Sequence, residues 1–216
     1  MTAPPFRLVI FDLDDTLVAS RIWVPAETRL YALLGQPYRP DIAARYKGMN
    51  ARDVGRTIHA HLQPAGYSAE ACGRLLRTFL LECAHAPTAP MPGADALVRA
   101  LAGRVPLAVA SGSPREVIRL LLARFGWLDA FTHLVTSEEV PRGKPAPDVF
   151  LETLRRTACA ADAAVVIEDS LPGVRAAKAA GLTCFVVPSS DDPRIAAAAD
   201  LAVPSLAALI PVLRPG

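Results

Sequence analysis

The sequence predicts an α/β fold in which a parallel sheet is flanked by helices and is interrupted, after its first strand, by an all-helical insertion. From residue 92 onward, short β-branched apolar runs alternate with helical segments of about ten residues, which is typical of βαβ units with right-handed crossovers. A further apolar run at residues 6–11 lies well upstream of this pattern. Between the two, residues 25–85 have helical patterns and no strand-like run.

The first strand is expected over residues 6–11, because β-branched and aromatic residues follow one another there without alternation, as in a strand covered on both faces. The insertion should then contain helices that end near glycine or before proline. They are expected over residues 25–34, 41–46, 53–62 and 68–84. Ser68 is a suitable N-cap for the last of these helices.

After the insertion, strands and helices should alternate to the end of the chain. The strands are expected over residues 105–110, 131–136, 163–168, 182–187 and 200–203, and the helices over residues 94–102, 114–125, 147–158, 171–180, 193–199 and 205–213. Ser113 should cap the helix that begins at Pro114, with Glu116 completing a capping box. Hinges rich in proline and glycine divide the chain into an α/β core domain, residues 1–17 and 92–216, and a helical domain, residues 18–91.

The composition indicates a chain that can bury a core and has no nucleic-acid-binding surface. Of its 216 residues, 52% are apolar, and the net charge is +2, so a clustered basic stripe is not expected. The N-terminus lacks a cationic segment followed by a long apolar stretch, and the apolar runs are too short to cross a membrane. We therefore expect a cytoplasmic protein without membrane partners, either a monomer or a weak homodimer. The four cysteines are far apart and indicate neither a zinc site nor a disulfide scaffold.

Two carboxylates follow the first predicted strand and are the strongest candidates for chemistry. Asp12 and Asp14 lie where an open α/β sheet presents its functional groups, at the carboxyl end of a strand. A desolvated carboxylate held by a metal can attack a phosphoryl group and form an acyl-phosphate that water later breaks. The alternative is that Asp14 and Asp15 only open a solvated turn.

Three further strand ends carry polar residues that could complete such a site. Ser111 and Gly112 precede a helix N-terminus, where unpaired N–H groups favour an anion, and Lys144 lies in a proline-stiffened loop and could neutralise a phosphate. Glu168 and Asp169 would repel each other unless a cation lies between them and Asp12, and their oxygen ligands suit Mg²⁺. Each of these signals has an ordinary alternative. Ser111 and Gly112 could simply form a turn, Lys144 could be an exposed lysine in a loop, and Glu168 with Asp169 could cap the next helix.

The order Asp-x-Asp-x-Thr, strand-end Ser, Lys-Pro and Glu-Asp resembles the haloacid dehalogenase-like hydrolase superfamily over nearly the whole chain. The helical insertion and the runs Gly-Lys-Pro-Ala-Pro-Asp and Glu-Asp-Ser-x-x-Gly are similar to the branch that contains phosphoglycolate phosphatase, sugar-phosphate phosphatases and β-phosphoglucomutase. This resemblance implies a Rossmann-like core and makes the insertion an all-helical cap domain that closes over the site.

The resemblance also implies roles for individual residues. Asp12 would be the nucleophile, Asp14 the acid that protonates the leaving group and then activates water, and Ser111 and Lys144 the phosphate ligands. Magnesium would be held by Asp12, the backbone carbonyl of Asp14, Asp169 and Glu168, the last directly or through water. In the cap, Lys47, Asn50 and Arg52 are candidates for gripping a distal hydroxyl, carboxylate or second phosphate, with a solvated helix end as the alternative. Trp23 is expected mainly as a packing residue, with a place at the mouth of the crevice as the alternative.

These observations together predict a Mg²⁺-dependent phosphomonoester hydrolase. It would act on a small phosphorylated metabolite, namely a sugar, polyol or carboxylated phosphate, through an aspartyl-phosphate on Asp12. A phosphomutase like β-phosphoglucomutase is the alternative enzyme, but Ala51 stands where that enzyme has an arginine. A non-catalytic ligand-binding or regulatory protein of the same fold is the third possibility, and the presence of Asp12, Asp14, Lys144 and Asp169 counts against it.

Overall fold

A parallel sheet forms the centre of the computed structural model, which describes residues 6–19, 21–43, 45–46 and 48–213. Six strands are found in this part of the chain: β1 (Leu8–Phe11), β2 (Leu107–Ser111), β3 (Phe131–Thr136), β4 (Ala164–Glu168), β5 (Thr183–Val186) and β6 (Leu201–Ala202). Their order across the sheet is β3-β2-β1-β4-β5-β6, and every neighbouring pair is parallel. The predicted α/β fold is therefore confirmed.

The strand order places the start of the chain at the middle of the sheet. From β1 the chain builds β2 and β3 on one side, and then crosses to build β4, β5 and β6 on the other. Because the chain adds strands on opposite sides of β1, a crevice opens at the carboxyl ends of the central strands, and ligands of open α/β sheets bind in such crevices. The residues after β1, β2 and β4 lie at this position.

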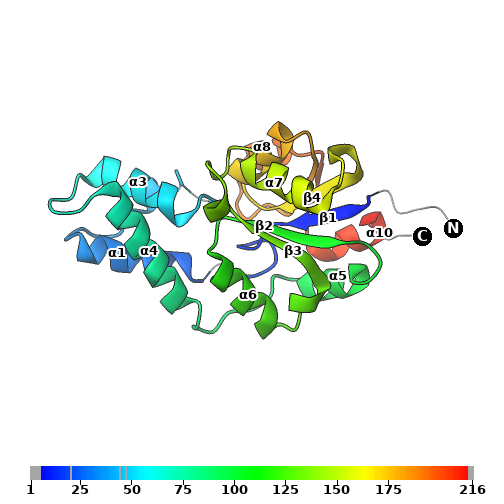
Figure 1. Ribbon diagram of the computed structural model, residues 1–216, viewed down its shortest axis with the longest axis horizontal. Helices are drawn as coiled ribbons and strands as arrows, with labels where there is room; N and C mark the ends of the chain where they lie inside the picture. Colours follow the sequence, from blue (N-terminus) through cyan, green and yellow to red (C-terminus); the bar gives the residue numbers. More distant parts are fainter. Residues whose placement is uncertain (1–5, 20, 44, 47, 214–216) are drawn as a thin grey trace.

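Helices cover both faces of the sheet (Figure 1). One face is covered by α5 (Ala94–Leu101), α6 (Arg115–Arg124), η4 (Leu206–Leu209) and α10 (Ile210–Leu213), and the other by α7 (Asp148–Thr157), α8 (Leu171–Ala179) and α9 (Pro193–Ala198). Alternate residues of β1 separate the two cores: Val9 and Phe11 pack toward α5 and α6, while Leu8 and Ile10 pack toward α7 and α8. Short 3-10 turns lie at η1 (Leu128–Ala130), η2 (Ser137–Glu139) and η3 (Ala161–Ala163).

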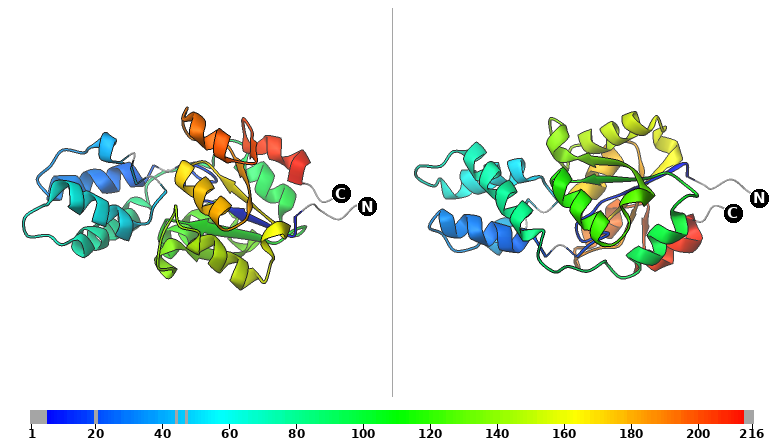
Figure 2. Two further views of the ribbon diagram at one scale, coloured as in Figure 1. Left: turned by 90° about the horizontal axis from the view of Figure 1, so that it is seen from above. Right: turned by 60° about the horizontal axis from the view of Figure 1, so that its bottom comes forward.

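Four helices between β1 and α5 form a separate group at one end of the molecule in all views (Figures 1 and 2). They are α1 (Trp23–Leu33), α2 (Pro40–Ala43), α3 (Ala51–Leu62) and α4 (Ala69–Cys83), and the described residues of this region contain no strand. This group is the cap that the resemblance implies. Val18 bridges both Asp14 and Pro90, so the segments that leave and re-enter the core lie side by side. The exact division into residues 1–17 with 92–216 and residues 18–91 remains our proposal.

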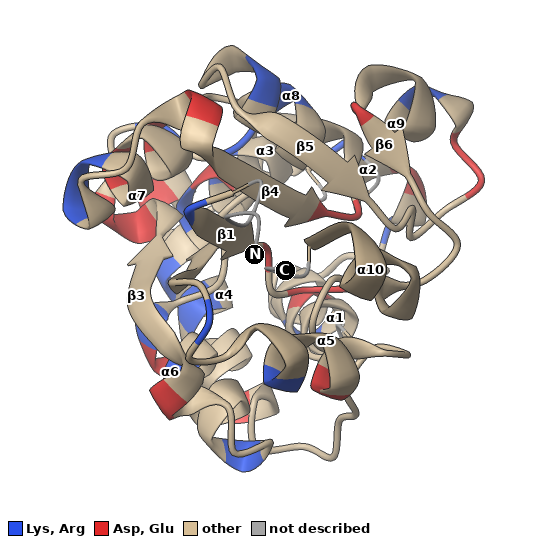
Figure 3. Ribbon diagram, turned by 90° about the vertical axis from the view of Figure 1, so that its right-hand side faces the viewer, with Lys and Arg blue, Asp and Glu red and all other residues tan. Residues whose placement is uncertain are grey.

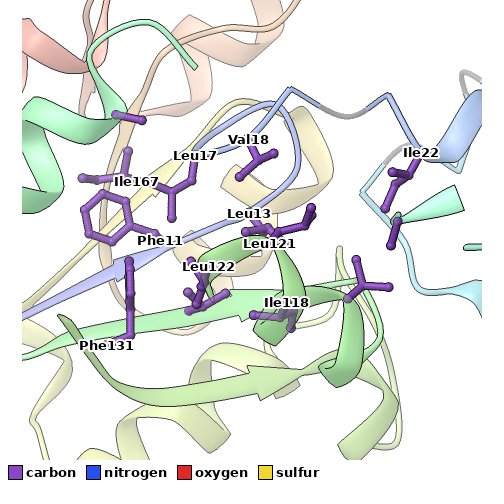
Figure 4. Close-up of a cluster of buried hydrophobic side chains, with 14 of the residues drawn as sticks. Phe11, Leu13, Leu17, Val18, Ile22, Ile118, Leu121, Leu122, Phe131 and Ile167 are labelled. Atoms are coloured by element: carbon purple, nitrogen blue, oxygen red, sulfur yellow. The ribbon is translucent and has the colours of Figure 1, made fainter. Parts of the chain in front are cut away.

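A continuous run of apolar side chains joins the sheet to the cap. Figure 4 shows Phe11, Leu13, Leu17, Val18 and Ile22 leading from the end of β1 toward the helical group. All five are at most 2% exposed and belong to one cluster that extends into α1, α3 and α4. The cap is therefore anchored to the core by packing at its base.

Most element boundaries agree with the sequence prediction to within two residues, and two local predictions were wrong. Ser68 does cap α4 by accepting the Ala71 N–H at 3.2 Å. However, α6 begins at Arg115 without a side-chain cap, so Ser113 and Glu116 do not form the expected capping box. The C-terminal helix expected over residues 205–213 is divided into a 3-10 turn, η4, and the short α10, with Pro211 near the junction.

Acidic and basic residues are interspersed along the ribbon in Figure 3. This mixture accords with the net charge of +2. Within the described part of the chain, none of the helices combines the length and the apolar character that a membrane crossing requires.

Candidate active site

Lys144 joins two strand ends through a set of short hydrogen bonds. Its Nζ atom donates to Asp12 Oδ1 at 2.6 Å, to Glu168 Oε1 at 2.7 Å and to the Ala110 carbonyl at 3.0 Å. An ammonium group has three hydrogens, so all of its donors are used within the protein. The Lys144 side chain has no exposed surface. It thus lies beneath the crevice and fixes the Asp12 carboxylate in place.

Glu168, at the end of β4, is held by the first turn of α8. Its Oε2 atom accepts the N–H groups of Asp169 and Ser170 and the Ser170 hydroxyl, at 3.0, 3.2 and 3.1 Å. A Cβ atom at residue 173 would overlap the Glu168 carboxylate, which explains the glycine in the Glu-Asp-Ser-x-x-Gly run. Ser170, and not Glu168 or Asp169, caps α8 through the Gly173 N–H.

Three buried carboxylates converge beside the lysine and suit a hard cation. Asp12, Glu168 and Asp169 each offer an oxygen, and these oxygens all lie within 4.8 Å of one another. The Thr16 hydroxyl donates to Asp169 Oδ1 at 3.3 Å. Burial of three acids beside the single ammonium of Lys144 leaves an excess of negative charge among these four residues, which Mg²⁺ with oxygen ligands would neutralise. The donor set therefore fits the expected metal.

Burial and the neighbouring charges shift the pKa values of Asp12 and Lys144. Burial raises the pKa of Asp12 well above its ordinary value; Lys144 opposes this effect, while Glu168, Asp169 and Asp14 add to it. Burial alone would lower the pKa of Lys144, but Asp12 and Glu168 outweigh it and raise that pKa. Lys144 is thus a permanent positive charge. A further cation beside Asp12 would favour the ionised form of the Asp12 carboxyl.

Asp14 lies against the turn that follows β2. The Ser113 hydroxyl donates to Asp14 Oδ2 at 2.7 Å, and the Ser111 hydroxyl lies 3.5 Å from the same atom. Ser111 in turn accepts the Ser113 N–H at 3.0 Å. The sequence analysis missed this role of Ser113, because a serine before Pro114 is also what a helix cap requires. The two serines connect Asp14 to the helix N-terminus at α6.

A cavity of about 310 Å³ lies between these strand ends and the cap. On the core side it is lined by Asp12, Asp14, Asp15, Gly112, Asp169 and Ser170, and on the cap side by Trp23, Val24, Glu27, Tyr38, Pro40, Ala43, Tyr46, Gly48 and Met49. Core and cap approach each other closely at Gly112, where a Cβ atom would lie 2.7 Å from the Met49 carbonyl oxygen. Trp23, which the sequence favours as a packing residue, also lines the cavity.

The cap residues expected to bind substrate have other partners. Asn50 is completely buried; it caps α3 through the Asp53 N–H and its amide lies 3.4 Å from the Ser137 carbonyl oxygen. Arg52 donates to the Pro141 carbonyl at 2.9 Å. Both therefore hold the cap against the core loop that leads to Lys144, and their role in binding substrate remains a prediction. Lys47 lies outside the described residues.

Arg77 of α4 makes a second connection between cap and core. It pairs with Glu138 of η2 at 2.9 Å and with Glu116 of α6 at 2.8 Å. In sequence, Arg77 and its two partners are distant from the apolar residues at the base of the cap. The two ion pairs hold the cap over the cavity. The sequence does not predict them, because each partner alone looks like an ordinary exposed charge.

Comparisons with known proteins identify the family. Residues 6–181 match the family of haloacid dehalogenase-like hydrolases. The chain is 31% identical over 219 residues to the validoxylamine A 7'-phosphate phosphatase of Streptomyces hygroscopicus subsp. limoneus, covering 93% of this chain and 94% of that protein. It is 35% identical over 182 residues to the fructose-1-phosphate phosphatase YqaB of Escherichia coli, covering 81% and 92%.

A solved structure with the same fold is that of a CbbY mutant from Rhodobacter sphaeroides in complex with xylulose-(1,5)bisphosphate. It superposes with a TM-score of 0.85 at 25% identity, over 97% of this chain and 99% of that one. The fold and the acidic strand ends define a hydrolase with an α/β core and a helical cap. The chain belongs to the haloacid dehalogenase-like hydrolase family, and it is an enzyme of the phosphatase type.

Proposed function

We propose that this protein is a Mg²⁺-dependent phosphomonoester hydrolase that acts on a small sugar, polyol or carboxylated phosphate through an aspartyl-phosphate on Asp12. The observation that supports this most is the contact of Lys144 with Asp12 and Glu168, beside Asp169 and beneath a cavity of substrate size. Asp12, Asp169 and Glu168 would hold Mg²⁺ together with the backbone carbonyl of Asp14. The metal would supply positive charge to the phosphate oxygens.

The residues divide the reaction into two displacements. An oxygen of Asp12 forms a bond to phosphorus while the ester P–O bond breaks, and Asp14 gives its proton to the departing alcohol oxygen. Asp14 then removes a proton from water, whose oxygen attacks phosphorus and breaks the bond to Asp12, releasing inorganic phosphate. Lys144 holds Asp12 in position through both steps, and the N–H groups at Gly112 and the start of α6 would face the phosphate.

The test is hydrolysis of p-nitrophenyl phosphate with and without Mg²⁺. We expect release of inorganic phosphate that is lost with a chelator and restored by the metal. Asp12→Asn should abolish the activity, whereas Asp129→Asn, which changes an exposed aspartate on η1, should leave it unchanged. Absence of turnover on any phosphate ester in the presence of metal would refute the proposal. Conversion of a sugar 1-phosphate to the 6-phosphate without release of phosphate would favour a mutase instead.

A further inference from the structure

Glu27 is an acidic residue on the otherwise aromatic and apolar cap side of the cavity. Among the described residues that line this side, it is the only one with an ionisable carboxyl or a cationic group. It lies on α1, is 4% exposed, and faces a space bordered by Trp23, Tyr38 and Tyr46. None of the reaction steps proposed above uses it.

The hydrogen bonds around Glu27 leave capacity for a ligand. The hydroxyls of Tyr38 and Tyr46 lie beside its carboxyl and hold its pKa below the value that burial alone would produce, although burial still raises it to about 7. The Tyr46 oxygen, like that of Tyr31, makes no hydrogen bond of ordinary geometry within the described part of the chain. A carboxylate can accept about four hydrogen bonds, so the neighbours that the structure describes do not saturate it.

A purely structural role does not account for this arrangement. A buried carboxyl costs free energy, and an apolar residue at the same position would extend the hydrophobic stripe of α1 that Ala26 and Leu30 provide. Polar groups that are buried at the edge of a cavity are commonly those that orient a bound molecule. The position of Glu27, across the cavity from Asp12 and Asp14, is where the organic part of a phosphate ester would lie.

We infer that Glu27 accepts hydrogen bonds from hydroxyl groups of the substrate, and that the substrate is the phosphate ester of a neutral polyol or sugar rather than an ester with a second anionic group. This inference rests on the proposed function and narrows it. Hydroxyls donate to a carboxylate, and the aromatic residues Trp23 and Tyr38, which line the same cavity, provide apolar surface for the C–H groups of a carbon chain. A second carboxylate or phosphate at this position would be repelled by the negative charge of Glu27 and by the four further acids on the opposite side of the cavity.

Matched pairs of esters test the inference. Glycerol 3-phosphate differs from 3-phosphoglycerate, and sorbitol 6-phosphate from 6-phosphogluconate, only by a hydroxymethyl group in place of a carboxylate. For the wild type, assayed above the Glu27 pKa of about 7 so that its carboxyl is ionised, we expect kcat/KM to be at least about tenfold higher for the neutral member of each pair. Glu27→Gln should lower kcat/KM about tenfold for the neutral members and change it much less for the acidic members and for p-nitrophenyl phosphate. Glu82→Gln, a matched change at a half-exposed residue of α4, should behave as the wild type.

A binding measurement separates this inference from the proposed function. Titration calorimetry of the Asp12→Asn variant with the same pairs should show tighter binding of the neutral esters, and Glu27→Gln added to that variant should remove the difference. The inference is overturned if the wild type prefers the acidic members, if Glu27→Gln lowers all activities equally, or if no ester binds. If no ester is hydrolysed but the neutral ones bind with this preference, the proposed hydrolysis fails and the inference stands.

Discussion

Replacing Glu27 with Gln should make the stability of the protein less dependent on pH. Burial raises the pKa of Glu27 from its ordinary 4.5 to about 7 in the folded protein, against the opposing effect of Tyr38 and Tyr46. Between these two values, the unfolded chain has released the proton and the folded protein still holds it. Raising the pH through this window therefore favours unfolding.

The size of the effect follows from the two pKa values. A tenfold change in proton affinity corresponds to about 1.4 kcal/mol, so the difference between 4.5 and about 7 corresponds to about 3 kcal/mol. The contribution of Glu27 to the free energy of unfolding is fully present below the lower value and is lost once the pH exceeds the upper one. Gln does not titrate, so Glu27→Gln should gain about 3 kcal/mol relative to the wild type over this range.

Urea unfolding followed by circular dichroism at several pH values from about 5 to about 8 measures this gain. The difference between the free energies of unfolding of Glu27→Gln and the wild type should grow steadily toward neutral pH and level off above it. Glu82→Gln serves as the control, because its side chain is 52% exposed and pairs with Arg29 at the surface. A difference between Glu27→Gln and the wild type that stays constant with pH would refute the reasoning.

Three further changes test other parts of the structure. Lys144→Met removes the counter-charge of two buried carboxylates, so urea unfolding near pH 8 should show that the free energy of unfolding falls by about 3–5 kcal/mol. Hydrolysis of p-nitrophenyl phosphate should fall as well. An unchanged unfolding midpoint would contradict the role of Lys144 as the buried counter-charge. Gly173→Ala places a methyl group against the Glu168 carboxylate and should lower the melting temperature, with a loss of about 1–3 kcal/mol. Arg52→Ala should lower kcat/KM to a similar degree for all esters, because Arg52 holds a core loop; a loss confined to esters with a second anionic group would instead support its role in substrate binding.

Much of the fold and of the acidic cluster could be predicted from the sequence, because local patterns specify both. Continuous β-branched runs mark β1 and β4, and turn and cap residues mark where helices begin and end. Parallel strands present their carboxyl ends at one edge, so the positions of Asp12, Lys144 and Asp169 after successive elements predict that they converge. The structure places them together around Lys144 and in the acidic cluster.

Only the tertiary structure shows what faces the cavity and what holds the cap. In sequence, Glu27 is one acidic residue in an amphipathic helix and reads as solvated, but the packing of α1 over the crevice buries it among tyrosines. In sequence, Asn50 and Arg52 are candidate substrate ligands or part of a solvated helix end, yet their partners include carbonyls of a core loop far along the chain.

The physical reason for this difference is the range of the interactions. Periodicity, capping and turn chemistry act over a few residues, so the sequence alone determined the α/β class, the helical insertion and the acidic strand ends. The contacts of Glu27, Asn50 and Ser113 depend on how one helix or turn lies against another, and hydrogen bonds between residues distant in the chain leave no local pattern. Tertiary packing thus decided the strand order, the saturation of Lys144 and the polar group on the cap side of the cavity.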